Sequence, residues 1–408
     1  MKTLTGPFTQ LLSLNNLGVK GPLHDEQLEV IINAGIVEED GKIVAVGEFE
    51  ALRMQFQGCE IAFIDAPMVV LPGFVDCHTH ICFDGSRSRD YAMRIAGKSY
   101  LEIARAGGGI WDSVTKTRQA DLVTLTENTV ARANRHLKDG VTTIEVKSGY
   151  GLSLEEELKM LRAIQKAGMH TQATLIATCL AAHMKPRDFE GTAGAYLQWI
   201  LEELLPVVQL EELTKRIDIF VEETAFSPEE ATWFLQQATA RGFAATVHAD
   251  QFTAGGSAVA AKAGAVSADH LEASTEIEIA LMAGSETVAV VLPGASLGLG
   301  MGYAPARKLL NAGASVAIAS DWNPGSAPMG DLLMQAAVMS AAEKLSTAEV
   351  LAGLTFRAAK ALQLTDVGKL ETGYQADFQG YPTADYRDIL YYQGKMKPTA
   401  VWKKGNLI

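Results

Sequence analysis

The stretch LPGFVDCHTH, residues 71–80, joins an apolar run to two histidines that are separated by one residue. Residues i and i+2 of a β-strand face the same side, so His78 and His80 can present two imidazoles to one metal ion. The alternative is two incidental polar residues at a strand end. We favour the metal site, because the active sites of parallel barrels lie at the carboxyl ends of their strands. Cys82 has the same parity and is a further candidate ligand, although buried cysteines more often pack as apolar residues.

On either side of this stretch, short β-rich runs alternate with longer helical patterns, which is typical of parallel βα units. Two of the predicted helices span 154–167 and 228–240, and Ser227 is the expected N-cap of the second. Eight strand–helix units of this size favour an α/β fold, a TIM-like (β/α)₈ barrel, although a doubly wound sheet remains open on periodicity alone. The eight predicted strands are 69–75, 141–146, 174–178, 217–221, 244–247, 265–267, 288–292 and 316–319.

The two ends of the chain have a different pattern. Residues 36–47 predict a β-hairpin with an EDGK turn, and residues 368–378 and 399–406 predict short strands. Neither end has enough apolar residues to close a core alone. We therefore expect a composite β-sandwich domain from residues 1–70 and 364–408, beside a barrel of residues 71–363.

Composition indicates a soluble globular protein. The 408 residues are 48% hydrophobic and 20% charged, and the net charge of −13 disfavours a nucleic-acid partner. Four cysteines in a chain of this length indicate no disulfide framework and fit a cytoplasmic location. The start of the chain lacks a signal-peptide pattern, and prolines and glycines interrupt the longest uncharged run, residues 287–306. We therefore expect no membrane segment.

Further polar residues also follow predicted strands. His183 comes after the third strand, His248 after the fifth, His270 after the sixth, and Asp321 after the eighth. One such histidine is more often a satisfied core residue, but several at one rim indicate a metal or acid–base centre. The remaining histidines are expected to be solvated: His24, His136 and His170.

The motif of residues 72–80 and the polar residues after the later strands resemble those of a known group of enzymes. The PGFVDxHTH pattern with His248, His270 and Asp321 resembles the amidohydrolase superfamily of metal-dependent hydrolases. Over essentially the whole chain, the sequence is similar to the family within it that acts on 4-imidazolone-5-propanoate in histidine degradation. The segments that carry this narrower likeness are SRSRDYAMRIAGKSYLEIARAGGGI (86–110), KSGYGL (147–152), HADQ (248–251), SADHLE (267–272) and SDWNPGS (320–326).

The resemblance implies a mononuclear metal site. Its ligands would be His78, His80, His248 and Asp321, around one Zn²⁺ or Fe³⁺ per subunit. The fourth predicted strand is followed by glutamates and lacks the carboxylated lysine of binuclear relatives. Lys147, after the second strand, is expected to be structural or salt-bridged.

The implied reaction is hydrolysis of the cyclic amide of 4-imidazolone-5-propanoate to N-formimidoyl-L-glutamate by a metal-activated water. Asp321 and His270 would move the proton from the water to the leaving ring nitrogen, and His183 would help to hold the oxyanion. The alternative role for His270 is to orient a ligand.

Substrate binding is also carried over from the resemblance. Arg87 would bind the propanoate carboxylate through its guanidinium fork. Without the resemblance, the tyrosines of this set are core aromatics and Asn-Pro-Gly is a simple turn. The other expected substrate contacts are Tyr100, Tyr150, His183, Gln251, Asn323, Gly325 and Ser326.

Two departures from the family pattern leave alternatives open. Asp84 places an anion near the expected carboxylate site, and Gln251 stands where some relatives carry glutamate. A purine- or pyrimidine-type deaminase would generally use that glutamate to protonate a ring nitrogen, which glutamine does not do. A non-catalytic metal-binding barrel is the third alternative, but it would be expected to have lost a ligand. The resemblance further implies a homodimer.

Overall fold

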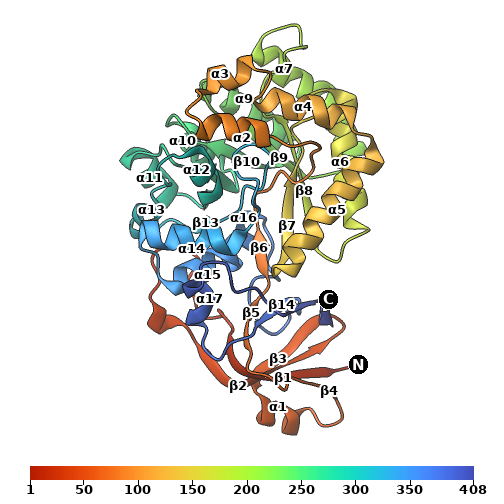
Figure 1. Ribbon diagram of the computed structural model, residues 1–408, viewed down its shortest axis with the longest axis vertical. Helices are drawn as coiled ribbons and strands as arrows, with labels where there is room; N and C mark the ends of the chain where they lie inside the picture. Colours follow the sequence, from red (N-terminus) through yellow and green to blue (C-terminus); the bar gives the residue numbers. More distant parts are fainter.

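The computed structural model describes residues 1–408, apart from the side chains of Tyr100 and Leu101. Its larger part is a parallel barrel whose strands follow the order β6 to β13 (Figure 1). The strands are β6 (Phe74–Asp76), β7 (Val141–Lys147), β8 (Thr174–Ala182), β9 (Arg216–Phe220), β10 (Ala244–Ala249), β11 (Ser267–His270), β12 (Val288–Val291) and β13 (Val316–Ile318). The predicted barrel is therefore confirmed.

The barrel closes just beyond the ends of its first and last strands. Asp321 N donates to His78 O at 3.0 Å, and His80 N donates to Trp322 O at 2.9 Å. Ser320 N donates to a carboxylate oxygen of Asp76 at 3.0 Å. The segments that follow β6 and β13 thus form the seam of the barrel.

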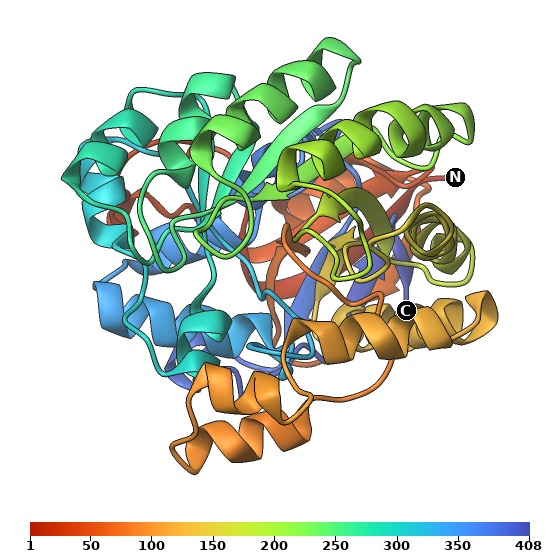
Figure 2. The same cartoon turned by 90° about the horizontal axis from the view of Figure 1, so that it is seen from above.

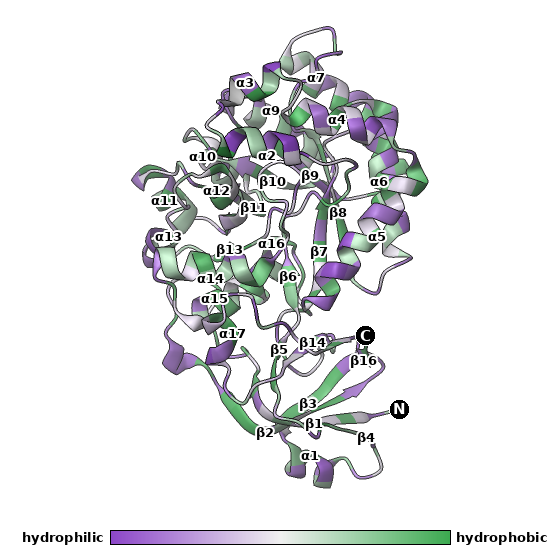
Figure 3. Ribbon diagram, in the orientation of Figure 1, coloured by the Kyte–Doolittle hydropathy of each residue, from purple (hydrophilic) through white to green (hydrophobic). Residues whose placement is uncertain are grey.

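Helices surround the strands in a ring (Figure 2). The strands are mostly hydrophobic, whereas helices of the ring combine polar and apolar residues (Figure 3). Helix α9 begins as predicted, because Ser227 and Glu230 form a capping box. The ring helices are α4 (Ile110–Gln119), α5 (Leu122–Lys138), α6 (Leu154–Gly168), α7 (Ala193–Trp199), η2 (Ile200–Leu204), α8 (Leu205–Leu210), α9 (Pro228–Ala240), α10 (Gly256–Ala263), α11 (Glu276–Ala283), α12 (Pro293–Leu299), α13 (Ala306–Ala312), α14 (Leu332–Glu343), α15 (Thr347–Leu354) and α16 (Phe356–Ala361).

Two short helices, α2 (Ser88–Ile95) and α3 (Tyr100–Arg105), follow β6 and lie near the upper end of the barrel in Figure 1. In the part of the chain described, no helix is long and apolar enough to cross a membrane.

Both ends of the chain build the smaller domain below the barrel (Figure 1), as predicted. Its strands form one connected sheet in the order β16-β15-β14-β5-β1-β2-β3, with β4 beside β1. Phe8, Phe378 and Trp402 meet in its core, where the last two rings stack at 4.6 Å. Its elements are β1 (Thr3–Leu12), η1 (Asp25–Gln27), β2 (Val30–Glu39), β3 (Lys42–Glu48), α1 (Phe49–Gln55), β4 (Glu60–Phe63), β5 (Val69–Pro72), β14 (Phe378–Tyr381), α17 (Arg387–Tyr391), β15 (Ala400–Lys403) and β16 (Asn406–Leu407).

Several predicted strands differ from the structure. The run 399–406 is two strands, β15 and β16, joined by a turn, and the predicted strand 265–267 lies earlier than β11. The run 69–75 is two strands, β5 in the small sheet and β6 in the barrel, with Gly73 between them. Gly73 N donates to Asp377 O, whereas the next amide, of Phe74, donates to Gly140 O, both at 2.9 Å. The chain therefore changes sheets within one apolar run. Residues 368–377 are not a strand, because β14 begins only at Phe378.

We expect Gly73→Ala to lower the free energy of unfolding by about 1–3 kcal/mol, because a Cβ there overpacks the junction. It would lie 2.4 Å from Thr142 Oγ1 and 3.0 Å from Thr142 Cβ. Urea denaturation measures the change. Gly284→Ala is the control, because the nearest atom to its Cβ would be 3.5 Å away. Equal stability of both variants would contradict the packing argument.

Candidate active site

Three buried imidazoles converge at the carboxyl ends of β6 and β10. His78 Nε2 lies 3.2 Å from His80 Nε2, which lies 3.3 Å from His248 Nε2. Tetrahedral zinc with bonds of 2.0–2.1 Å separates its nitrogen ligands by about 3.3 Å. The three rings are therefore spaced as ligands of one ion would be.

Protonation and tautomer also suit a metal. The carboxylate of Asp269 accepts a hydrogen bond from His78 Nδ1 at 2.6 Å, and Asp218 Oδ2 lies 2.9 Å from His248 Nδ1. A carboxylate beside Nδ1 favours, in both rings, the tautomer with the proton on Nδ1 and a lone pair on Nε2. Burial lowers the pKa of His78 and His80 well below the usual value, and that of His248 to about 3. Neutral rings that direct lone pairs at one another repel unless a cation lies between them.

Asp321 lies beside these rings. Its Oδ1 is 3.5 Å from His80 Nε2 and 3.6 Å from His78 Nε2, and its Oδ2 accepts from Ser326 Oγ at 3.3 Å. Burial raises the pKa of Asp321 to about 7. The structure therefore brings together the four residues predicted as ligands, in a donor set that fits a divalent or trivalent ion with one open position.

His270, at the end of β11, also faces the centre. Its ring centroid is 5.8 Å from that of His78 and 5.4 Å from that of His248. Burial opposes protonation of His270, but Glu272, whose Oε2 lies 3.6 Å from Nδ1, raises its pKa overall. A raised pKa favours the protonated ring, which can donate a proton. The sequence prediction included His270 and missed its partner, Glu272.

The hydrogen bond of His183 favours one of its two predicted roles, contact with the substrate, over the other, holding the oxyanion. Its Nδ1 donates to Gly149 O at 3.0 Å, and burial lowers its pKa to about 4. The neutral ring therefore has only a lone pair on Nε2. This arrangement suits acceptance of a hydrogen bond from a substrate N–H rather than donation to an oxyanion.

A cavity of about 760 Å³ opens over the convergent rings. Most of the predicted substrate contacts line it, and Arg94 and Lys98, to which the sequence gave no role, line it as well. The side chain of Tyr100 lies outside the described residues. The predicted residues that line the cavity are Arg87, Tyr150, His183, Gln251, Asn323, Gly325 and Ser326.

Arg87 is held in place by a residue that the sequence did not reveal. Its Nε donates to Asp90 Oδ2 at 2.7 Å, and the same oxygen accepts from Gly109 N at 2.8 Å. A Cβ at Gly108 would lie 2.3 Å from Asp90 Oδ1, which explains the glycine there. The RSRD and GGGI segments are thus two halves of one support for Arg87.

Asn323 is fully used within its own turn. Its Nδ2 donates to Asp321 O and Ser326 Oγ, and its Oδ1 accepts from the amides of Gly325 and Ser326, all at 2.7–2.8 Å. This favours a role in shaping the turn over direct contact with substrate.

The structure also shows the surroundings of three other residues for which the sequence analysis made predictions or left a role open. Asp84 accepts from Asn128 Nδ2 on α5 at 2.9 Å, so its carboxylate is bound there. Cys82 Sγ lies 3.7 Å from Met160 O on α6, and burial raises the pKa of the thiol to about 12, so it is no metal ligand. His136 was expected to be solvated, but it is buried with Nε2 3.1 Å from Asp76 Oδ2. That prediction was wrong, because its partner lies far away in the sequence.

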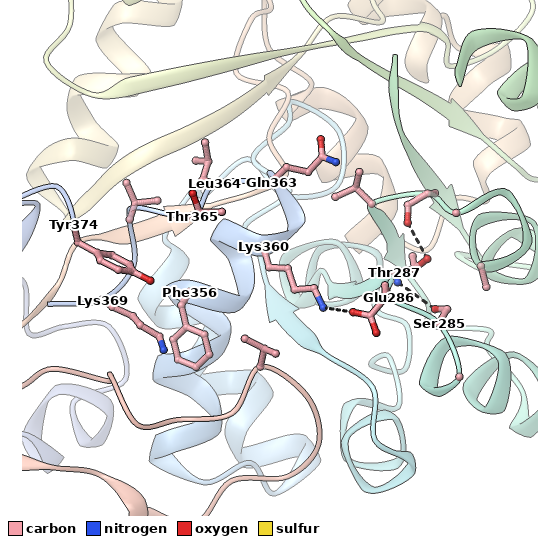
Figure 4. A pocket seen from close by; sticks show the side chains of 17 residues that line it. Ser285, Glu286, Thr287, Phe356, Lys360, Gln363, Leu364, Thr365, Lys369 and Tyr374 are labelled. Atoms are coloured by element: carbon pink, nitrogen blue, oxygen red, sulfur yellow. Dashed lines mark hydrogen bonds and ion pairs between the residues drawn. The ribbon is translucent and has the colours of Figure 1, made fainter. Parts of the chain in front are cut away.

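A second cavity, of about 730 Å³, lies toward the amino ends of β11 and β12 (Figure 4). Lys360 Nζ is 2.9 Å from Glu286, and Lys369 Nζ donates to Asn15 O at 2.9 Å. Both cations therefore have partners within the protein, and this cavity lacks the convergent groups of the first.

A parallel barrel with convergent imidazoles and an aspartate at its carboxyl rim is the arrangement of a metal-dependent hydrolase. The Amidohydrolase family profile matches residues 69–408. Imidazolonepropionase from Symbiobacterium thermophilum is 41% identical over 95% of this chain and 93% of its own length. Imidazolonepropionase from Bdellovibrio bacteriovorus is 38% identical over 100% of this chain and 97% of its own. The chain belongs to the amidohydrolase family and, within it, to the imidazolonepropionases.

Solved structures agree on the fold. The zinc-bound adenosine deaminase from Xanthomonas campestris has a TM-score of 0.71 at 18% identity, covering 99% of this chain and 92% of its own.

We expect the protein to bind about one equivalent of Zn²⁺, and His80→Ala and His248→Ala to lose it, because each removes a convergent nitrogen. Metal content after dialysis against Zn²⁺ measures this. His170→Ala is the control, since His170 is exposed on the surface. Retention of a full equivalent by both site variants would exclude these residues as ligands.

Proposed function

We propose that this protein hydrolyses 4-imidazolone-5-propanoate to N-formimidoyl-L-glutamate in histidine degradation. The observation that carries the proposal is one cavity whose lining combines Arg87 with imidazoles of the convergent histidine cluster. Its membership of the imidazolonepropionases, over nearly the full length of the relatives, supports the same reaction.

The metal site is part of the proposal. His78, His80, His248 and Asp321 would hold one Zn²⁺ or Fe³⁺, because nitrogen-rich ligands with one carboxylate suit either ion. When bound, the ion would supply Lewis-acid activation of the attacking water and of the amide carbonyl. Proton transfer and substrate binding are performed by side chains of the protein.

Proton transfer is assigned to Asp321 and His270. Water adds its oxygen to the ring carbonyl carbon, the carbon–nitrogen bond of the cyclic amide breaks, and the departing nitrogen takes a proton. Asp321 takes the proton of the attacking water, and His270, paired with Glu272, gives its own proton to the nitrogen. The proton on Asp321 then passes to His270, so both groups return to their starting states. The lone pair on His183 Nε2 orients the ring by accepting from its N–H.

Binding of the propanoate is assigned to Arg87. Asp90 occupies Nε of Arg87, so the two terminal nitrogens remain for the substrate carboxylate. Tyr150, Gln251 and the Gly325–Ser326 turn would surround the ring. We also propose a cytoplasmic homodimer, as the family resemblance implies.

A deaminase acting on purines or pyrimidines is the second candidate, favoured by the shared fold with adenosine deaminase. Gln251, which lines the cavity, counts against it because a glutamine amide can hydrogen-bond a ring nitrogen but cannot transfer a proton to it.

We expect the Zn²⁺-loaded protein to consume 4-imidazolone-5-propanoate, followed by loss of its near-ultraviolet absorbance. Asp321→Asn should lower kcat by about 10²–10⁴-fold, because it removes a proton acceptor. No consumption by metal-loaded protein would refute the proposal. Release of ammonia from guanine or cytosine would support the deaminase instead.

Arg87→Met should raise KM by about 10–100-fold, because a charge-assisted fork to a carboxylate is lost. Metal content should stay at the level of the unmodified protein. Arg89→Met is the matched control, since this neighbouring arginine is exposed. An unchanged KM in Arg87→Met would remove the carboxylate-binding role.

A further inference from the structure

Lys147 is the last residue of β7 and takes no part in the proposed reaction, yet it is buried beneath the convergent rings. Its Nζ lies 2.8 Å from Glu145 Oε1, 2.8 Å from Asp218 Oδ2 and 3.7 Å from Asp269 Oδ2. The side chain of Lys147 is only 1% exposed. One ammonium is therefore shared by three buried carboxylates from three strands, β7, β9 and β11.

Two of these carboxylates orient metal-site rings. Asp269 accepts from His78 Nδ1, and Asp218 Oδ2 lies against His248 Nδ1 while its Oδ1 accepts from the backbone amide of His248 at 3.2 Å. Each thus sets both the direction and the tautomer of its ring.

The third carboxylate holds the backbone between the first two histidines. Glu145 Oε2 accepts from Thr79 N at 3.2 Å, and the carbonyl oxygen of Glu145 accepts from Thr79 Oγ1 at 2.6 Å. The whole segment that carries His78 and His80 is therefore linked to Lys147 through Glu145.

The charge of Lys147 makes this arrangement possible. Burial by itself would lower the pKa of the ammonium, but Asp218, Glu145 and Asp269 raise it above the usual value. Arg216, also buried, donates instead to Thr178 Oγ1 at 3.4 Å and to Ala361 O at 3.1 Å. Without Lys147, the three carboxylates would repel one another and would lose the ammonium that fixes their positions.

We infer that Lys147 is a positioning residue of the metal site. Its ammonium fixes three carboxylates, and these carboxylates aim the Nε2 lone pairs of His78 and His248 at one point. The inference rests on the proposed metal site but not on the identity of the substrate.

The test is the Zn²⁺ dissociation constant of metal-depleted protein, measured by competition with a chromophoric chelator. Lys147→Met should bind Zn²⁺ about 10–100-fold more weakly than the unmodified protein. Lys403→Met is the matched control, because it breaks another buried lysine–aspartate pair, with Asp377 at 2.5 Å, in the small domain. It should keep the affinity of the unmodified protein. Equal affinities in Lys147→Met and the unmodified protein would overturn the inference.

A double-mutant cycle on Zn²⁺ affinity distinguishes a positioning role of Lys147 from a general loss of stability. If Lys147 acts through Asp218, the loss of affinity in Lys147→Met/Asp218→Asn should be smaller than the product of the two single losses. Strictly multiplicative losses would contradict action through Asp218.

A charge-balanced pair covers the case in which Lys147→Met does not fold. Lys147→Met/Glu145→Gln removes a buried negative charge together with the ammonium, and is compared with Glu145→Gln alone. The double variant should again bind Zn²⁺ about tenfold or more weakly. Failure of both Lys147 variants to fold, with Lys403→Met folded, would overturn the inference in favour of a role in folding. Normal Zn²⁺ affinity without turnover of the imidazolone would refute the proposed function alone.

Discussion

The backbone hydrogen bonds that join the segments after β6 and β13 are the interaction on which the rest of the site depends. His78, His80 and Asp321 lie within these two segments, so the bonds that close the barrel also set the spacing of three of the four proposed ligands. The fourth, His248, is fixed from β10 on the far side of the barrel. The hydrogen bonds that close the barrel therefore also determine the geometry of the proposed metal site.

Much of this arrangement is predictable from sequence because it follows from one rule. Polar residues at the carboxyl ends of parallel strands must meet at one rim, which identifies His78, His248, His270 and Asp321 without knowledge of their partners. The hairpin of the small domain and the cap of α9 were equally local signals.

What could not be predicted depends on contacts that form only in the folded chain. The role of Asp90 follows from one carboxylate oxygen that accepts hydrogen bonds from both Arg87 and Gly109. His136 lies near the end of a helix and was expected to be exposed to solvent, but it is buried beside Asp76. The break at Gly73 was hidden because one apolar run serves two sheets, and periodicity does not record which neighbour an amide bonds to. The role of His183 likewise required the position of the Gly149 carbonyl.

The sheet of the small domain has a consequence for synthesis. Strand β5 lies between β1, at the start of the chain, and β14, near its end, and it continues directly into the barrel. While the ribosome is still making the barrel, one edge of β5 has no partner and is open to pairing with other nascent chains. The C-terminal strands cover that edge only as translation finishes. The last residues to be made therefore complete the sheet that the first ones begin. Premature termination would leave the β14-facing edge of β5 unpaired and prone to aggregation, beside an otherwise finished barrel.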